Sequence, residues 1–310
     1  MDEGLSKQSP RYVEIDVSEW RLSGEEKMGT KPKRWLMEPD TEAHWLMKDA
    51  REFNTAKDGS RYRVGYDWAE RIACGVAGVL GLPAAEVELC VARKGEEYVY
   101  GTICRSVCER NTEELVHGDE LLAEQGVSVA RDRRSYTLEA IHRALEDCGP
   151  PTNALPHLST WEVFVGYLVL DALIGNTDRH AANWTVVRSE SGRFLAPTFD
   201  HASSLGFQLS DSERLERTST KDHNRTPEAF ADRAKTKFAC KPHPIDAVAE
   251  ARMLDGEDAA AHWLDQPHRI DDLVAPIRAI PEHRMSTPAR GFAERVMRRN
   301  WARLTASDAR

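Results

Sequence analysis

The stretch that decides the fold is LDALIGNTDRHAANW, residues 170–184, which begins apolar and ends in a run of charged and amide side chains. Within it, Asp178 and Asn183 have the Asp-x-x-x-x-Asn spacing of a protein-kinase catalytic loop. In such a loop the acid accepts the acceptor's proton and the amide oxygen faces a metal ion. A second segment, LAPTFDHASSLG, places Asp200 at the end of a predicted strand, where a further oxygen ligand of Mg²⁺ is required.

Two charged residues upstream supply the other groups that phosphoryl transfer needs. Lys48 ends a strand-like run, AHWLMK, and Glu70 lies in a helix predicted from Asp67 to Leu80. Such sites place a cation on the triphosphate and often a carboxylate on that cation. The order of residues therefore predicts Lys48 as a triphosphate contact and Glu70 as its ion-pair partner, although either residue alone reads as a surface position.

Several residues near the motif have two interpretations. His180 either braces the loop through a backbone hydrogen bond or takes part directly in catalysis, and bracing is favoured. Arg179 is either a solvated charge or a phosphate contact, with the solvated charge slightly favoured. Trp68 and Trp184 are interpreted as core residues rather than as platforms on which a nucleotide stacks.

The segment SGEEKMGTKPK, residues 23–33, precedes the strand that carries Lys48. It lacks the glycine spacing of a P-loop and that of most protein kinases. Its position nevertheless allows its backbone amides, with Lys27 or Lys31, to reach a phosphate. A solvated basic turn is the alternative.

The order of elements predicts an α+β fold with two lobes. Short strands and one helix precede about residue 108, and mostly helical periodicity follows. The most apolar segment, residues 159–175, is predicted to be a buried helix capped by Ser159 or Thr160. The other expected elements are two strands around Gly95, helices at 113–125 and 136–149, a hairpin of 184–187 with 194–199, and further helices to the end of the chain.

Composition narrows the class of protein. A net charge of −9 and a pI near 5.7 argue against a general nucleic-acid-binding protein, which usually has a basic face. The six cysteines include one close pair, Cys104 and Cys108, with no second pair to complete a zinc site. Neither a signal peptide nor an apolar stretch long enough to cross a bilayer is found, so the expected location is the cytoplasm and no membrane association is expected.

The two motif segments resemble the signature of the HipA-type serine/threonine kinases, bacterial toxin kinases and their stand-alone relatives. The similarity extends upstream to SGEEKMGT, WLMK and the helix region 67–89. It implies a two-lobed, protein-kinase-like fold with a small β-rich N-lobe (1–107) and a mostly helical C-lobe (108–310). It also implies dependence on ATP and Mg²⁺.

The resemblance assigns a role to each candidate residue. Asp178 would be the catalytic base, with His180 beside it, and Asn183 and Asp200 would bind the metal. The nucleotide contacts would be Lys48, Glu70, Gly24, Lys27, Gly29, Thr30, and Ile103 and Arg105 in a hinge that meets adenine. Family members phosphorylate proteins, and many autophosphorylate a serine in the nucleotide loop, where Ser23 and Thr30 are the available hydroxyls.

The resemblance also bears on partners. A protein substrate is expected, and an antitoxin-like or regulatory partner is a further possibility, with no direct contact to nucleic acid. The longer toxins of the family meet their antitoxin through an additional N-terminal subdomain. Because Lys48 comes early in this sequence, we expect that subdomain to be absent. A small-molecule or lipid kinase of the same fold, or a nucleotide-binding module without turnover, is the alternative function.

Overall fold

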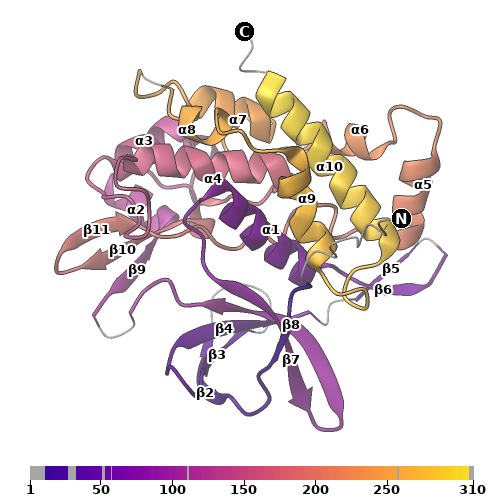
Figure 1. The fold of residues 1–310 in the computed structure, drawn as a ribbon. Helices are drawn as coiled ribbons and strands as arrows, with labels where there is room; N and C mark the ends of the chain where they lie inside the picture. Colours follow the sequence, from indigo (N-terminus) through magenta and orange to yellow (C-terminus); the bar gives the residue numbers. More distant parts are fainter. Residues whose placement is uncertain are drawn as a thin grey trace, which may run out of the picture.

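The computed structural model describes residues 11–26, 33–50, 53–56, 58–109, 112–256 and 258–306. A six-stranded sheet forms the lower part of the molecule in Figure 1, and the helices gather above it. Its strands, in spatial order, are β1 (Glu14–Asp16), β7 (Val87–Lys94), β8 (Glu97–Arg105), β4 (His44–Asp49), β3 (Lys33–Met37) and β2 (Arg21–Glu26). The β1 strand runs parallel to β7, and every other neighbouring pair is antiparallel.

Helix α1 (Tyr66–Leu80) lies between this sheet and the other helices (Figure 1). Its apolar positions recur at helical spacing and are buried, and Gly81 ends the helix in the left-handed conformation that glycine adopts without a steric penalty. The predicted helix from Asp67 to Leu80 is therefore confirmed. Glu70 is on the buried side of α1, so this helix brings a carboxylate to the boundary between the lobes.

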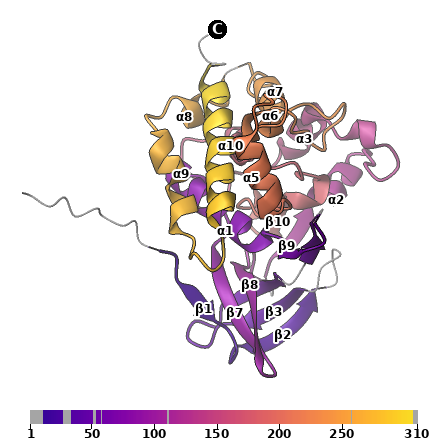
Figure 2. The same cartoon turned by 90° about the vertical axis from the view of Figure 1, so that its right-hand side faces the viewer.

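The helical part is built around α4 (Thr160–Ile174), which is buried on nearly every side. Ser159 caps it by accepting a hydrogen bond from the Glu162 amide, as one of the two predicted caps requires. Figure 2 shows α10 running the height of this lobe. The other helices are α2 (Gly118–Glu124), α3 (Leu138–Leu145), α5 (Asp211–Ser219), α6 (Pro227–Ala231), α7 (Pro244–Ala251), α8 (Ala261–Leu264), α9 (Ile270–Ala279) and α10 (Thr287–Ala306).

A second, three-stranded sheet lies beneath the helices, in the order β11 (Gly192–Leu195), β10 (Thr185–Ser189), β9 (Glu114–His117). The predicted helix at 113–125 is wrong in its first half, because β9 pairs with β10 and only the residues from Gly118 form a helix. The predicted second hairpin strand is also too long: it ends at Leu195, and Thr198 bridges instead to Ala84 beyond α1. A small hairpin of β5 (Phe53–Thr55) and β6 (Arg61–Arg63) was not predicted.

Arg284, just before α10, connects the helical lobe to α1 and to the large sheet. Its buried guanidinium donates to the Asp67 carboxylate in α1 and to backbone oxygens of Cys90 and Gly101 in the large sheet. The predicted boundary at residue 107 lies after β8, which ends at Arg105, and before β9, which begins at Glu114. The arrangement of a β-rich lobe under a helical lobe confirms the predicted α+β class.

Candidate active site

Lys48 links the two lobes at the candidate site. On β4 it lies directly opposite Thr102 of β8, and Leu46 lies opposite Cys104, so these four side chains share one face of the sheet. The Lys48 Nζ atom is 2.8 Å from Oδ1 of Asp200. Burial disfavours the ammonium, but the carboxylates of Asp200 and Glu70 outweigh that effect and raise the pKa of Lys48 above its usual value.

Glu70 is buried close to Lys48 but does not form the predicted ion pair with it, because the ion-pair partner of Lys48 is Asp200. Its Oε1 atom is 3.7 Å from Nδ1 of His201, and the hydrogen bond of Lys48 goes to Asp200 instead. Burial works against ionisation of Glu70, whereas the charge of Lys48 and the His201 imidazole favour it and lower the carboxyl pKa. Glu70 therefore acts on Lys48 through its charge in this structure.

Asp200 comes after the end of β11 at Leu195 and has an unusual backbone conformation, with a φ of 60°. Aspartate tolerates this left-handed region better than most residues, and such positions cluster at functional sites. The turn aims the carboxylate at the N-lobe sheet, where Lys48 holds the pKa of Asp200 well below its usual range. A carboxylate that stays ionised is what a metal ligand requires.

The catalytic loop holds Asp178 between two groups from elsewhere in the chain. Its Oδ1 atom is 3.2 Å from Nζ of Lys237, and its Oδ2 atom accepts a long hydrogen bond of 3.5 Å from Ser203. The side-chain amide of Asn183 donates to the Asp178 backbone oxygen at 2.7 Å, and this hydrogen bond fixes the two motif residues relative to each other. The Asp178 amide donates in turn to the Asn176 side chain. The motif is thus closed by its own hydrogen bonds.

Arg179 is buried, so the slightly favoured interpretation as a solvated charge was wrong. Its guanidinium makes two hydrogen bonds to Asp171 of α4, at 2.7 and 2.9 Å, and one to the Asn183 backbone oxygen at 2.6 Å. It also donates to Thr198 Oγ1, which is 2.8 Å from Nε2 of His201. One buried network therefore connects α4, the catalytic loop and the segment that carries Asp200.

His180 caps the short 3₁₀ turn η2 (Ala181–Asn183), because its Nδ1 atom accepts a hydrogen bond from the Ala182 amide. This contact is the bracing role that the sequence favoured. Trp68 and Trp184 are both buried among the core side chains. Trp184 donates to the hydroxyl of Tyr136, which donates to the Arg179 backbone oxygen, so the loop is anchored on this side as well.

The family model of the HipA-like C-terminal domain matches residues 24–263 of the chain. The chain belongs to the HipA-like family. Two of the solved structures with a similar fold are bacterial proteins. The Helicobacter pylori proinflammatory kinase CtkA is 19% identical at a TM-score of 0.73, with 96% of this chain and 98% of that chain covered. HipA of Shewanella oneidensis MR-1, solved with HipB and operator DNA, is 15% identical at a TM-score of 0.50, with 93% and 66% covered.

These likenesses establish a kinase-like fold for this HipA-like chain. The comparison with curated proteins finds no match. Among the residues that the structure describes, no helix is both long and apolar enough to cross a membrane.

The side chains of Ile103 and Arg105, the two predicted hinge residues, point away from the sheet face that carries Lys48. The Ile103 side chain is fully buried with Met47 and Trp45 in the separate core of the N-lobe, on the sheet face opposite Lys48. Arg105 binds Glu86 at 3.2 Å instead. An alternating strand exposes every second residue to the same face, and Ile103 and Arg105 are out of phase with Lys48.

The residues in phase with Lys48 were missed by the sequence interpretation. Thr102 and Cys104 face the site, and burial near Glu70 and Asp200 raises the pKa of the Cys104 thiol to about 12. Lys33 lies opposite Lys48 on β3 and contributes to the low pKa of Asp200. Lys33 and Thr102 pair directly with Lys48 on the neighbouring strands, and Cys104 is two residues from Thr102. The strand pairing therefore identifies all three.

The predicted nucleotide loop is described only in part. Gly24 lies in β2, where the pairing with β3 shifts by one residue. Ser23 is within hydrogen-bond distance, 3.2 Å, of Nδ1 of His44. Lys27, Gly29 and Thr30 lie outside the described residues.

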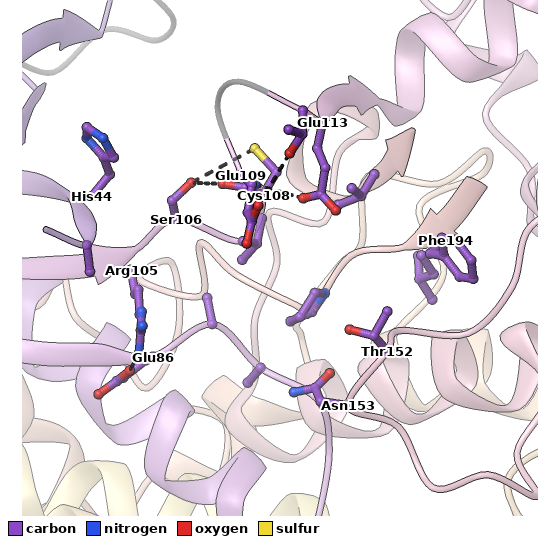
Figure 3. Close-up of a pocket in the computed structure, with 18 of the residues that line it drawn as sticks. His44, Glu86, Arg105, Ser106, Cys108, Glu109, Glu113, Thr152, Asn153 and Phe194 are labelled. Atoms are coloured by element: carbon purple, nitrogen blue, oxygen red, sulfur yellow. Dashed lines mark hydrogen bonds and ion pairs between the residues drawn. The ribbon is translucent and has the colours of Figure 1, made fainter. Parts of the chain in front are cut away.

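A cavity of about 800 Å³ opens beside the β8–β9 connection (Figure 3). It is lined by Arg105, Ser106 and Cys108 on one side and by Asn153 and Phe194 on the other. The lining includes none of Lys48, Asp178, Asn183 and Asp200, so this cavity is separate from the candidate chemistry.

Asp200 and Asn183 offer a carboxylate and an amide oxygen, the donors that suit Mg²⁺. Within the described parts of the chain, no three His, Cys, Asp or Glu side chains converge as a metal site. Mg²⁺ that is bound with a nucleotide commonly takes one or two protein ligands and completes its shell with phosphate and water. The side-chain nitrogen of Asn183 donates to the loop backbone, and this hydrogen bond fixes the orientation of the side chain.

Gly118 → Ala is expected to destabilise the protein by about 1–3 kcal/mol, because overpacking a filled site forces its neighbours apart. A Cβ on Gly118 would lie 2.1 Å from the Trp184 ring and 2.5 Å from the Ala181 backbone oxygen. Gly78 → Ala is the matched control: that glycine is inside α1 and a Cβ there meets nothing within 4 Å. Urea unfolding of the two variants measures the difference. An equal stability of both would contradict the tight packing behind the loop.

Proposed function

We propose that this protein is an ATP- and Mg²⁺-dependent kinase that phosphorylates serine or threonine of a protein. The observation that carries the proposal is the 2.8 Å contact between Lys48 of the N-lobe sheet and Asp200 of the helical lobe. It unites a cation for the triphosphate with a carboxylate for the metal, from positions 152 residues apart. Ser203, three residues beyond Asp200, contacts Asp178, so the proposed base belongs to the same site.

The chain's own residues divide the chemistry among them. Lys48 binds the triphosphate, and Glu70 stabilises the ammonium through its charge. Asp200 and Asn183 would hold Mg²⁺, which when bound neutralises phosphate charge. Asp178 accepts the proton of the acceptor hydroxyl, and its side chain is 35% exposed, enough for an acceptor to reach it. Ser23 is the described hydroxyl proposed for autophosphorylation, with Thr30 as the second candidate.

The proposal of a protein acceptor is supported by family membership, and not by a feature of the site itself. We propose a cytoplasmic location and a bacterial source on the same ground. HipA of Shewanella oneidensis was solved with HipB, and an antitoxin-like or regulatory partner for this chain is a proposal that rests on that likeness.

The test is transfer of label from γ-labelled ATP with Mg²⁺, to the protein itself and to a bacterial lysate. We expect label in protein bands, and we expect Asp200 → Asn to lose more than about 100-fold of it, because metal-assisted charge stabilisation is a large term in phosphoryl transfer. Asp265 → Asn, an exposed carboxylate at the end of α8, is the control that retains activity.

The fractions that carry label distinguish the alternatives. Label in a lipid or metabolite fraction and in no protein would replace the proposal by a small-molecule or lipid kinase. Nucleotide binding by calorimetry with no label in any fraction would indicate a binding module without turnover.

A further inference from the structure

Lys237 places an ammonium group at the proposed base, and neither motif predicts it. Its Nζ atom lies 3.2 Å from Oδ1 of Asp178, and its side chain remains 50% exposed. It comes from the connection between α6 and α7, 59 residues beyond Asp178 in the sequence. An exposed lysine is normally mobile, so the question is what holds this one at the site.

The residues on either side of Lys237 are anchored. Phe238 is buried and packs against Tyr136, with ring centroids 5.1 Å apart. Thr236 is buried as well, and both its amide and its hydroxyl donate to the Pro242 backbone oxygen, at 2.9 and 3.0 Å. The lysine therefore projects from a short loop that is closed on itself and fixed to the core.

The loop also adopts a backbone conformation that L-residues avoid. Cys240 and Lys241 are consecutive non-glycine residues with φ of 62° and 50°. Such conformations persist only where the surrounding structure imposes them, and they cluster at functional sites. Tyr136, whose ring packs on Phe238, also donates its hydroxyl to Arg179 of the catalytic loop. The Lys237 loop and the catalytic loop thus share one anchor.

We propose that Lys237 is a catalytic residue that contacts the phosphoryl group during its transfer; this rests on the proposed kinase function. An acceptor hydroxyl bound to Asp178 must lie next to the phosphorus that it attacks. A cation fixed beside the same carboxylate therefore lies next to the phosphoryl oxygens, where negative charge must be stabilised. Lys48 is held at Asp200 and Arg179 at Asp171, so Lys237 supplies the charge on the acceptor side.

The step balances with the groups named. A bond forms between the acceptor oxygen and the γ-phosphorus, and the bond from that phosphorus to the bridging oxygen of ADP breaks. The acceptor proton passes to the Asp178 carboxylate. Lys237 stays protonated throughout and donates hydrogen bonds.

The alternative role for Lys237 is inhibitory. A lysine that only masks the base would occupy Asp178 in the resting enzyme and leave it when the acceptor arrives. Its removal would then leave transfer unchanged or increase it. The sign of the effect of a Lys237 substitution therefore separates the two roles.

The test compares Lys237 → Met with Lys235 → Met, which removes the same charge two residues earlier from an exposed position. We expect kcat to fall by about 100-fold or more for Lys237 → Met, the scale of losing one group that stabilises transition-state charge. Lys237 → Arg should retain part of the activity, and Lys235 → Met nearly all. Equal activity of the two Met variants, or a gain for Lys237 → Met, would overturn the proposal.

A binding measurement gives a readout that a structural role would not produce. By calorimetry, Lys237 → Met should weaken binding of a non-hydrolysable ATP analogue several-fold and leave ADP binding unchanged, because only the triphosphate has the phosphate that Lys237 contacts. Equal effects on both nucleotides, or none, would contradict the contact. If the wild type binds the analogue but transfers nothing, the kinase function fails, and the analogue-to-ADP difference still decides whether Lys237 touches the terminal phosphate. Absence of any nucleotide binding would overturn both proposals.

Discussion

Asp178 → Asn is expected to lower the rate of phosphate transfer by about 10²–10⁴-fold, the usual contribution of a general base. The amide keeps the shape of the side chain but cannot accept the acceptor's proton. The loop should survive the change, because the hydrogen bonds of Asp178 within the loop use its backbone: the amide donates to Asn176 and the carbonyl oxygen accepts from Asn183. Nucleotide affinity is expected to change little.

The measurement is single-turnover transfer at saturating ATP, with nucleotide affinity by calorimetry and the melting temperature on the same samples. Asp265 → Asn again serves as the matched loss of one exposed carboxylate. Transfer at the wild-type rate by Asp178 → Asn would contradict the assignment of the base. A large loss accompanied by a lower melting temperature would point to the loop structure instead.

Local patterns in the sequence predicted the elements whose determinants are local. The apolar spacing of α1 and α4, the glycine after α1 and the serine before α4 are all readable within one helix. The strand β9 was mistaken for helix because its four residues have no periodicity of their own. They become a strand by pairing with β10, about 70 residues later.

The residues of the candidate site also divide into those that a local sequence pattern predicts and those that depend on the tertiary fold. Asp178 and Asn183 were predicted because a spacing motif contains them, and Asp200 because it comes after a predicted strand. The partner of Lys48 was not, because Glu70 and Asp200 are both carboxylates and the choice depends on the turn at Asp200, with its φ of 60°. Lys237 has no sequence signal at all: a lysine between two buried residues reads as a surface position until the tertiary fold places it at Asp178.

Arg179 → Met is expected to destabilise the protein by about 3–5 kcal/mol, the cost of leaving one member of a buried ion pair without its partner. Asp171 is itself buried and would keep only its hydrogen bond from the Asn176 side chain. The change also removes donors from Thr198 and from the Asn183 backbone oxygen. Unfolding by urea, followed by circular dichroism, measures the loss.

A double variant tests whether the unpaired charge causes the loss. Arg179 → Met combined with Asp171 → Leu removes both charges, and a buried ion pair replaced as a whole by apolar residues costs much less than one that is broken. We therefore expect the double variant to be more stable than Arg179 → Met alone, by about 1 kcal/mol or more. Additive losses would show that the hydrogen bonds to Thr198 and Asn183 carry the stability. In that case the network holds the catalytic loop through neutral contacts, and the Asp171 charge is not required for it.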